Sequence, residues 1–488
     1  MPFAAPIPPL PAHQLFVFLL QAGLLILLAL LCGRLAARFG MPAVAGELCV
    51  GVLLGPTVLG SAAPQLSQWL LPPTTDQFHL LDALGQIGVV LLVGVTGMEM
   101  DVGLIRRRGA TALSVGLGGL LLPLGLGVAA GYAAPGSLIP AGIGRPAFAL
   151  FIGVALCVSA LPVIAKTLTD MNLLHRNVGQ LTLAAGMVDD IIGWILLSVV
   201  TAMAMGDARP ESVALLIGAT VLVLAATALV GRPLVRRVLR ATERSEPGIT
   251  VAAATALILL SAAATHALGL EAMFGAFLAG MLIGSVAGSG AGSVAGSSSG
   301  DGSGSRPEPA AGSGSRGASG DVSGAGSGAV PVLARLAPLR TVVLAVFAPL
   351  FFATAGLRID LTALADPPVL AAAVVLLLVA VVGKVAGAFA GARIGRLGPW
   401  ESLALGGALN ARGVIQLVIA TVGLRIGVLT TTTYTLIVLV AIATSLMAPP
   451  ILRFAMRRVE QTAEEELRRR ERTFLPLHPT EAPADPNP

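Results

Sequence analysis

The chain has 488 residues, of which 55% are hydrophobic and 12% are charged, and its mean hydropathy is +0.87. Soluble domains are roughly 45–50% apolar and about 25% charged, so this composition excludes a soluble domain and indicates a polytopic membrane protein. The net charge of +5 does not indicate a nucleic-acid partner, because most arginines lie in loops and in the tail, where membrane topology explains them. The cysteines Cys32, Cys49 and Cys157 fall in apolar segments, so we expect no disulfide.

Apolar segments recur along the whole chain and predict an all-α fold of about 13 transmembrane helices. The first segment follows a proline-rich start without basic residues, which favours a retained helix over a cleaved signal. The predicted spans are 14–37, 42–60, 81–98, 111–133, 147–169, 179–205, 213–235, 248–269, 271–285, 339–357, 369–392, 400–424 and 429–453.

Basic residues are distributed unevenly over the predicted loops. If the N-terminus lies outside, most of the 31 lysines and arginines fall in loops, linker and tail on the cytoplasmic side. Cytoplasmic loops of membrane proteins carry such an excess, so the sequence predicts an outer N-terminus and a cytoplasmic C-terminus. The outer loops hold only Arg145, Arg209, Arg358 and Arg425.

Two segments are predicted to lie outside the membrane. Residues 286–330 are rich in Gly, Ser and Ala, which is typical of a flexible linker. Residues 454–488 form a short charged cytoplasmic tail, too short for a folded regulatory domain. Within the tail, Glu464, Glu465 and Glu466 each precede an arginine by four residues, a spacing that favours a helix.

Two adjacent carboxylates, Asp189 and Asp190, lie in the middle of the apolar segment 179–205. A carboxylate at bilayer depth is costly, so such a residue is usually paired, faces a cavity or is functional. The other reading is a loop between two shorter apolar segments, but no turn residues flank the pair. We therefore interpret the pair as the centre of a functional site.

An internal repeat is suggested by two interrupted spans. The spans at 147–169 and 400–424 are broken at 159–162 and 410–413, and they lie seven spans apart, which inverts their direction in the membrane. Paired broken helices are typical of the midplane site of secondary transporters. We predict two inverted six-helix repeats, spans 1–6 and 8–13, joined by span 7. Their free backbone groups would line a cavity that the carboxylates face.

Seven motifs follow one another along the chain: 41–48 with 54–60, 97–101, 159–166 (SALPVIAK), 274–280, 349–352, 383–384 and 409–413. In this order they resemble the monovalent cation:proton antiporter-2 family, in particular its sodium/proton and plant cation/proton exchanger branches. The resemblance covers about residues 14–453. It implies an exchanger-type transmembrane domain with a core of spans 4–6 and 11–13 and an interface of spans 1–3 and 8–10. It also implies a homodimer in a bacterial plasma membrane.

The resemblance implies antiport of a monovalent cation, Na⁺ or K⁺, for protons by alternating access, with no enzymatic activity and no cofactor. We assign Asp190 as the carboxylate that binds either a proton or the cation. Competition at one site is sufficient for exchange, since the bare carboxylate cannot cross the apolar barrier cheaply. Ser159 is a candidate second ligand, although a serine in a helix commonly bonds its own backbone.

By resemblance, Asp189 pairs with Lys384 of span 11. Lys166 and Lys384 are the only lysines of the chain, so a lysine at membrane depth does not reflect general usage. A desolvated lysine can lose its proton, whereas arginine stays charged. The alternative is a structural ion pair that offsets half-helix dipoles. In the family, an Asp-Asp pair with this lysine accompanies electrogenic exchange.

Other intramembrane polar residues have less specific readings. Arg412 is expected to compensate charge or to satisfy carbonyls freed by the second break. Glu47 and Asn410 are candidates for the ion path, and helix packing explains Glu47 equally well. Gln416 stands where many family members carry Glu, which leaves Asp189 as the expected partner of Lys384.

Two other functions were compared with antiport. A cation channel or an efflux path without strict proton coupling would share the fold. An intramembrane enzyme using two aspartates is disfavoured, because the aspartates of such enzymes lie on different helices or in separate motifs, whereas here they are adjacent.

Overall fold

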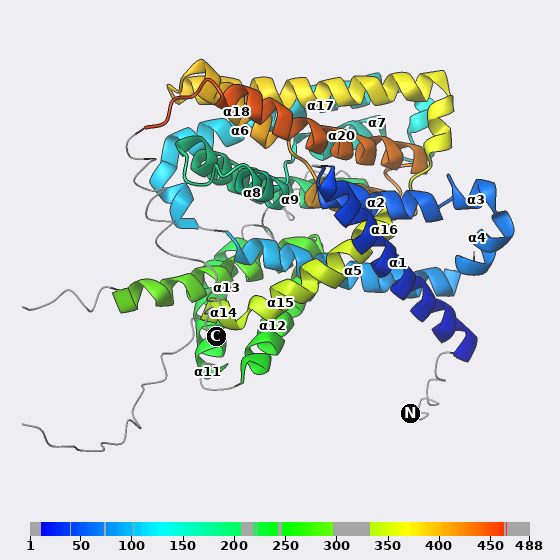
Figure 1. Ribbon diagram of the computed structural model, residues 1–488, viewed down its shortest axis with the longest axis horizontal. Helices are drawn as coiled ribbons and strands as arrows, with labels where there is room; N and C mark the ends of the chain where they lie inside the picture. The colour runs from blue at the N-terminus through cyan, green and yellow to red at the C-terminus, as the bar shows by residue number, and fades with distance from the viewer. Residues whose placement is uncertain are drawn as a thin grey trace, which may run out of the picture.

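In the computed structural model, all the secondary structure of the described residues is helical (Figure 1). These are residues 11–39, 41–72, 75–100, 102–205, 218, 220, 222–242, 246–295, 332–462 and 465. The α-helices are α1 (Ala12–Arg38), α2 (Ala43–Leu54), α3 (Leu59–Ala62), α4 (Pro64–Leu70), α5 (Thr75–Met98), α6 (Val102–Ala133), α7 (Arg145–Cys157), α8 (Leu161–Asp170), α9 (Asn177–Met205), α11 (Arg232–Thr242), α12 (Pro247–Ala267), α13 (Ala272–Ala295), α14 (Val332–Arg335), α15 (Ala337–Val342), α16 (Ala348–Gly356), α17 (Pro367–Ile394), α18 (Pro399–Leu409), α19 (Val414–Arg425) and α20 (Thr431–Met456). Short 3-10 or π segments are η1 (Gly136–Leu138), η2 (Thr227–Gly231), η3 (Val343–Phe347) and η4 (Leu361–Ala365).

The described helices agree with most of the predicted spans. Ten spans are long and apolar enough to cross a membrane, and the bent pair α18–α19 makes an eleventh. These coincide with predicted spans 1–6, 8 and 10–13, while predicted span 9 is a shorter apolar helix at Ala272–Ala287. Predicted span 7, at 213–235, lies partly outside the described residues. The total of 13 spans and the inverted repeat therefore stay predictions.

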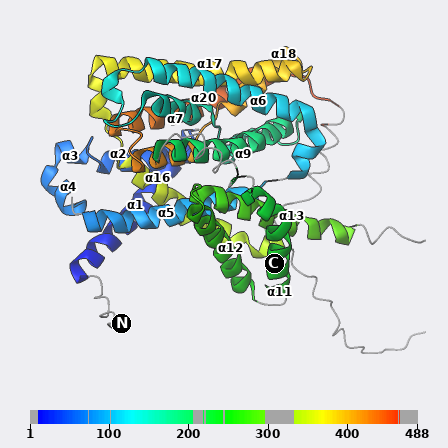
Figure 2. The same ribbon diagram turned by 180° about the vertical axis from the view of Figure 1, so that it is seen from behind.

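Figures 1 and 2 show the helices in two neighbouring groups. One group contains α6–α9 and α17–α20, and α17 packs along α6 within it. The other contains α1, α5, α12 and α13, with α2 and α16 packed on each other beside the first group. The broken helices and α9 all belong to the first group, so the candidate site lies inside it.

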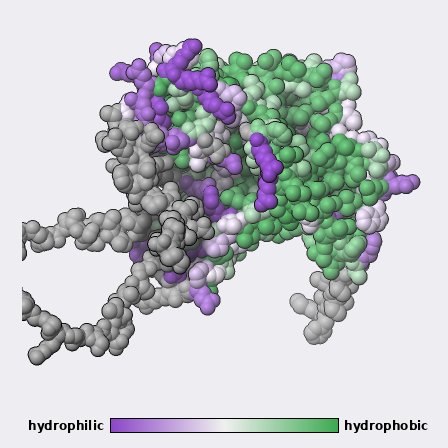
Figure 3. Space-filling model, in the orientation of Figure 1, coloured by the Kyte–Doolittle hydropathy of each residue, from purple (hydrophilic) through white to green (hydrophobic). Residues whose placement is uncertain are grey.

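The outer surface is hydrophobic over a broad area. Figure 3 shows this on one face, with most hydrophilic residues toward the left of the view. Leu19, Leu260 and Leu378 are 59%, 68% and 57% exposed, on three different helices. Monomeric soluble proteins rarely expose apolar patches of this extent, whereas a bilayer would cover them. The chain is a multi-pass membrane protein.

The predicted linker and tail differ in detail from the structure. α13 extends to Ala295, so the first ten residues of the predicted linker 286–330 are helical. Alanine and small residues continue a helix readily when an apolar helix precedes them. The rest of the linker lies outside the described residues. In the tail, Glu465 is described, while Arg468–Arg470 lie outside.

Close packing of α17 on α6 depends on glycine. A Cβ added at Gly387 would lie 2.2 Å from the carbonyl oxygen of Gly118, and one at Gly391 would lie 2.1 Å from that of Ser114. Together with Gly383, these glycines recur every four residues and form one face of α17. Small residues at this spacing let two membrane helices approach closely.

We predict that Gly387→Ala destabilises the protein by about 1–3 kcal/mol, because the added methyl forces α6 and α17 apart. Gly125→Ala is the matched control, since a Cβ there meets nothing within 4 Å. Thermal unfolding of the purified proteins in detergent measures the difference. Equal unfolding temperatures for the two variants would show that the glycine face does not limit the packing.

Candidate functional site

Two membrane helices are interrupted near their middle. Residues 158–160 between α7 and α8 are not helical, and neither are residues 410–413 between α18 and α19, where the axis bends by 44°. The first break, 158–160, ends two residues before the end of the predicted 159–162, because Leu161 and Pro162 already form the first turn of α8. A proline is favourable there, since N–H groups of the first turn have no partner within the helix.

The two breaks contact each other directly. The Ala160 N–H donates to the Ala411 carbonyl over 3.1 Å, and the Ser159 hydroxyl donates to the Leu409 carbonyl over 2.8 Å. The breaks therefore satisfy part of each other's freed backbone, as is required at membrane depth. Ser159 is fully buried, and its hydroxyl bonds the facing break rather than its own helix.

α9 packs closely against the first break at two glycines, Gly186 and Gly193. A Cβ at Gly186 would lie 3.1 Å from the Leu161 side chain, and one at Gly193 would lie 2.8 Å from Val158. Asp189 and Asp190 lie between these two contact points in sequence. The sequence therefore brings both carboxylates to the level of the first break.

Asp189 is held by two groups, one in the first break and one on α17. Its Oδ2 accepts hydrogen bonds from the Ser159 N–H at 2.8 Å and from Lys384 Nζ at 2.7 Å. Lys384 Nζ also donates to the Cys157 carbonyl at 2.5 Å. Both side chains are 1% exposed, so the ion pair is shielded from water and its geometry is fixed by charge-assisted hydrogen bonds.

Asp190 differs from its neighbour in having no such partner. It is fully buried, and neither carboxylate oxygen has a hydrogen-bond partner among the described residues. Consecutive helical side chains point about 100° apart, so Asp190 cannot share the contacts of Asp189. An ionised carboxylate buried without a partner is very costly. Its side chain therefore requires a proton or a bound cation.

The second break contributes further buried polar groups. Arg412 donates from Nη2 to the Ala380 carbonyl of α17 at 3.1 Å, and its backbone N–H and carbonyl both bond the Ser445 hydroxyl. Within the described part of the chain, Arg412 Nε and Nη1 and both side-chain atoms of Asn410 lack hydrogen-bond partners. The second break therefore offers hydrogen-bond donors on Arg412 and Asn410 and one acceptor, the Asn410 side-chain oxygen.

Two further predicted residues, Glu47 and Gln416, have other neighbours. Glu47 is half-buried on α2, where a Cβ at Gly33 of α1 would meet its side chain at 3.3 Å. Gln416 is buried on α19 and donates to the Ile437 carbonyl at 3.4 Å. A small cavity of about 10 Å³ reaches Arg412 between α2 and helices α8, α19 and α20.

Sequence reasoning missed the backbone partners of the site. The Cys157 carbonyl binds Lys384, and the Leu409 carbonyl binds Ser159. No sequence signal could identify them, because every residue carries a carbonyl. The described residues contain no group of three or more His, Cys, Asp or Glu that could hold a metal ion.

Comparison with known families supports the reading of the motifs. The family model described as "Sodium/hydrogen exchanger, transmembrane" matches residues 25–291 and 324–458. Among solved structures, the chain resembles the sodium proton antiporter MjNhaP1 from Methanocaldococcus jannaschii, with a TM-score of 0.60 and 14% identity. That alignment covers 91% of this chain and 97% of the other, and at this identity it shows a shared fold alone.

Curated relatives include three antiporters. Cation/H⁺ antiporter 17 of Arabidopsis thaliana is 26% identical over 90% of this chain and 48% of its own length. The Na⁺/H⁺ antiporter NhaS4 of Synechocystis sp. is 28% identical over 90% of this chain and 97% of its own. The Na⁺/H⁺-K⁺ antiporter GerN of Bacillus cereus is 27% identical over 90% and 96%. The chain spans about half the length of the plant relatives it matches.

We predict that Lys384→Ala destabilises the protein by about 3–5 kcal/mol, because it leaves Asp189 charged, buried and without its partner. Lys166→Ala is the matched control, since the other lysine of the chain is exposed on α8. Thermal unfolding in detergent measures both. If Lys384→Ala unfolds at the same temperature as Lys166→Ala, the buried ion pair does not stabilise the fold.

Proposed function

Since the chain belongs to the sodium/hydrogen exchanger family, a family of membrane transporters and not of enzymes, we propose that it is a secondary antiporter. It exchanges a monovalent cation for protons by alternating access. The names of its relatives, cation/H⁺, Na⁺/H⁺ and Na⁺/H⁺-K⁺ antiporters, support this substrate class. Na⁺ and K⁺ are the cations that those names suggest.

The single observation that carries this proposal is the Asp190 carboxylate. It is buried at mid-helix, and none of the described residues bonds to either oxygen. A proton neutralises it in one state and a monovalent cation in the other, so each excludes the other. The charged and empty carboxylate is the state that cannot cross the apolar barrier. This competition couples the two fluxes.

Asp189 and Lys384 have a different role in this mechanism. Their short ion pair keeps Asp189 neutralised, so that Asp190 alone competes for the transported ions. Ser159 orients Asp189 through its N–H, and its hydroxyl oxygen has lone pairs left for a cation. Arg412 and Asn410 contribute to the polar lining. A purely structural ion pair would stabilise the fold without affecting the charge moved per cycle.

The proposal includes an arrangement in the membrane. The chain has 13 spans as two inverted repeats, with its N-terminus outside and its C-terminus in the cytoplasm. α6–α9 and α17–α20 form the moving core, spans 1–3 and 8–10 form the interface of a homodimer in the plasma membrane, and span 7 links the two repeats. The excess of arginine in the predicted cytoplasmic loops supports this orientation.

We predict that Asp190→Asn abolishes cation-dependent proton release and leaves the protein folded, because Asn is close in volume but cannot ionise. Reconstituted proteoliposomes carrying an internal pH dye measure the exchange, as dequenching on addition of Na⁺ or K⁺. Asp366→Asn is the matched control, since this exposed carboxylate precedes α17 and makes no capping hydrogen bond. Retained exchange in Asp190→Asn would remove this residue from the central role.

A further inference from the structure

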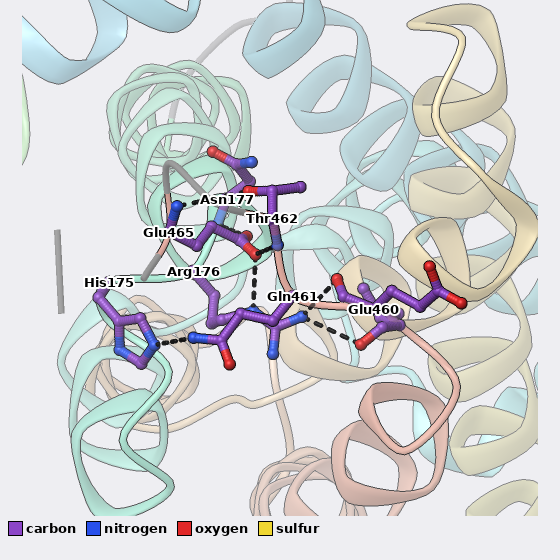
Figure 4. Close-up of polar contacts among 8 residues, drawn as sticks. His175, Arg176, Asn177, Glu460, Gln461, Thr462 and Glu465 are labelled. Atoms are coloured by element: carbon purple, nitrogen blue, oxygen red, sulfur yellow. Dashed lines mark hydrogen bonds and ion pairs between the residues drawn. The ribbon is translucent and has the colours of Figure 1, made fainter. Parts of the chain in front are cut away.

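The chain beyond α20 turns back and contacts the cytoplasmic start of α9. Figure 4 shows this contact, which we call the tail latch. The tail side of the latch follows residue 458, where the match to the family model ends. Its residues are His175, Arg176 and Asn177 on one side and Glu460, Gln461, Thr462 and Glu465 on the other, together with the Val459 carbonyl.

Arg176 holds the end of α20. Its Nη2 donates to the carbonyls of Val459 at 3.1 Å and Glu460 at 3.0 Å, and its Nε lies 3.1 Å from Glu465 Oε2. Carbonyls just after a helix have no partner within it, and a basic side chain near a helix C-terminus is favourable. The Arg176 side chain is only 11% exposed, so these contacts are largely shielded from water.

Glu465 holds the beginning of α9. Its Oε1 accepts from the N–H of Asn177, the first residue of that helix, at 2.6 Å, and its Oε2 accepts from the Thr462 N–H at 2.9 Å. A carboxylate at a helix N-terminus is stabilised by the unpaired N–H groups and the helix dipole. The carboxylate comes from a residue 288 positions away along the chain, so it acts as a cap between segments that are distant in sequence.

The charge state of Glu465 is fixed at neutral pH. Burial opposes its ionisation, but the N–H groups of Asn177 and Thr462 and the Arg176 guanidinium outweigh burial, so the pKa of Glu465 lies below its ordinary 4.5. A lowered pKa contributes stability above the unfolded value, which is lost only as the pH falls through the folded value. Glu465 is therefore ionised throughout the neutral range.

The latch joins the start of α9 to the segment after α20, and the neighbouring Arg458 adds a contact to α18. Arg458, next to the latch, lies over the Trp400 ring at 4.2 Å, and Trp400 is in the first turn of α18, half of a broken helix. α9 is thus held at its start by Glu465 and near its middle by the Asp189 contacts. Asp190 lies 13 residues after Asn177, or about 20 Å along the helix. A shift or rotation at the start of α9 would be transmitted to this carboxylate.

We propose that Arg176 and Glu465 are positioning residues for exchange: through the tail latch they fix the axial position and rotation of α9, and thereby the placement of Asp190 between the broken helices. This inference rests on the proposed antiport function. Opening the latch changes how well the site binds the cation, beyond any change in the amount of folded protein.

The test compares Glu465→Gln, Arg176→Gln and their double variant in proteoliposomes, with the apparent cation KM, the maximal rate and the unfolding temperature measured for each. We expect each single variant to raise KM by about twofold to thirtyfold. The KM of the double variant should not exceed that of the more impaired single variant, since either substitution alone opens the same latch. Glu460→Gln is the control: its exposed side chain loses the same charge, and its carbonyl is unchanged. Glu465→Asp keeps the charge on a shorter side chain, so its KM should lie between those of the wild type and Glu465→Gln. It replaces Glu465→Gln in the test if that variant does not fold.

Suppose that the wild-type protein exchanges ions but that Glu465→Gln or Glu465→Asp has the same KM as Glu460→Gln. This result would contradict the positioning role of the latch and leave the proposed function intact. So would strictly additive effects of Arg176→Gln and Glu465→Gln. Failure of the proposed function has a different signature, because wild-type and Asp190→Asn proteins would then give the same flux.

Discussion

The buried pair between Lys384 and Asp189 is the interaction on which the arrangement of the core helices depends. Two charges can remain in an apolar interior only when their other hydrogen-bonding positions are also satisfied. The break between α7 and α8 provides this, because it frees the Cys157 carbonyl for Lys384 and the Ser159 N–H for Asp189. The glycine face of α17 brings the lysine close enough, since any larger residue at Gly387 would meet the α6 backbone.

The pair also explains why two adjacent carboxylates can have different roles. Asp189 is neutralised by a fixed cation, whereas Asp190 has no bonded partner in the described part of the chain. A buried carboxylate in that condition must take its compensating charge from solution. Competition of proton and cation for this position, as we propose, meets the minimum requirement of an exchanger. The tail latch, as we propose it, acts on the same helix, since Glu465 bonds the first residue of α9.

Much of the fold was predictable from local patterns. Apolar length located most spans, and Pro162 and Gly413 marked the two breaks to within a few residues. The resemblance to a known family and the scarcity of lysine singled out Lys384. Contacts through backbone groups were not predictable, because a carbonyl such as that of Cys157 has no sequence signature. Neither was the cap of Asn177 by Glu465, since the Glu-to-Arg spacing in the tail indicated only local pairs. The linker boundary was wrong by ten residues at α13, where small residues continue the helix to Ala295.

The central claim is that protons and a monovalent cation compete for one carboxylate and are therefore obligatorily coupled. The most direct test imposes a pH gradient on wild-type proteoliposomes with equal cation concentrations on both sides and the membrane potential held at zero. Radioactive Na⁺ and Rb⁺, the latter as a substitute for K⁺, report the cation flux. Our account predicts uphill cation accumulation that collapses when a protonophore dissipates the gradient. Cation movement that only ever runs downhill, whatever the proton gradient, would contradict it and indicate an uncoupled path.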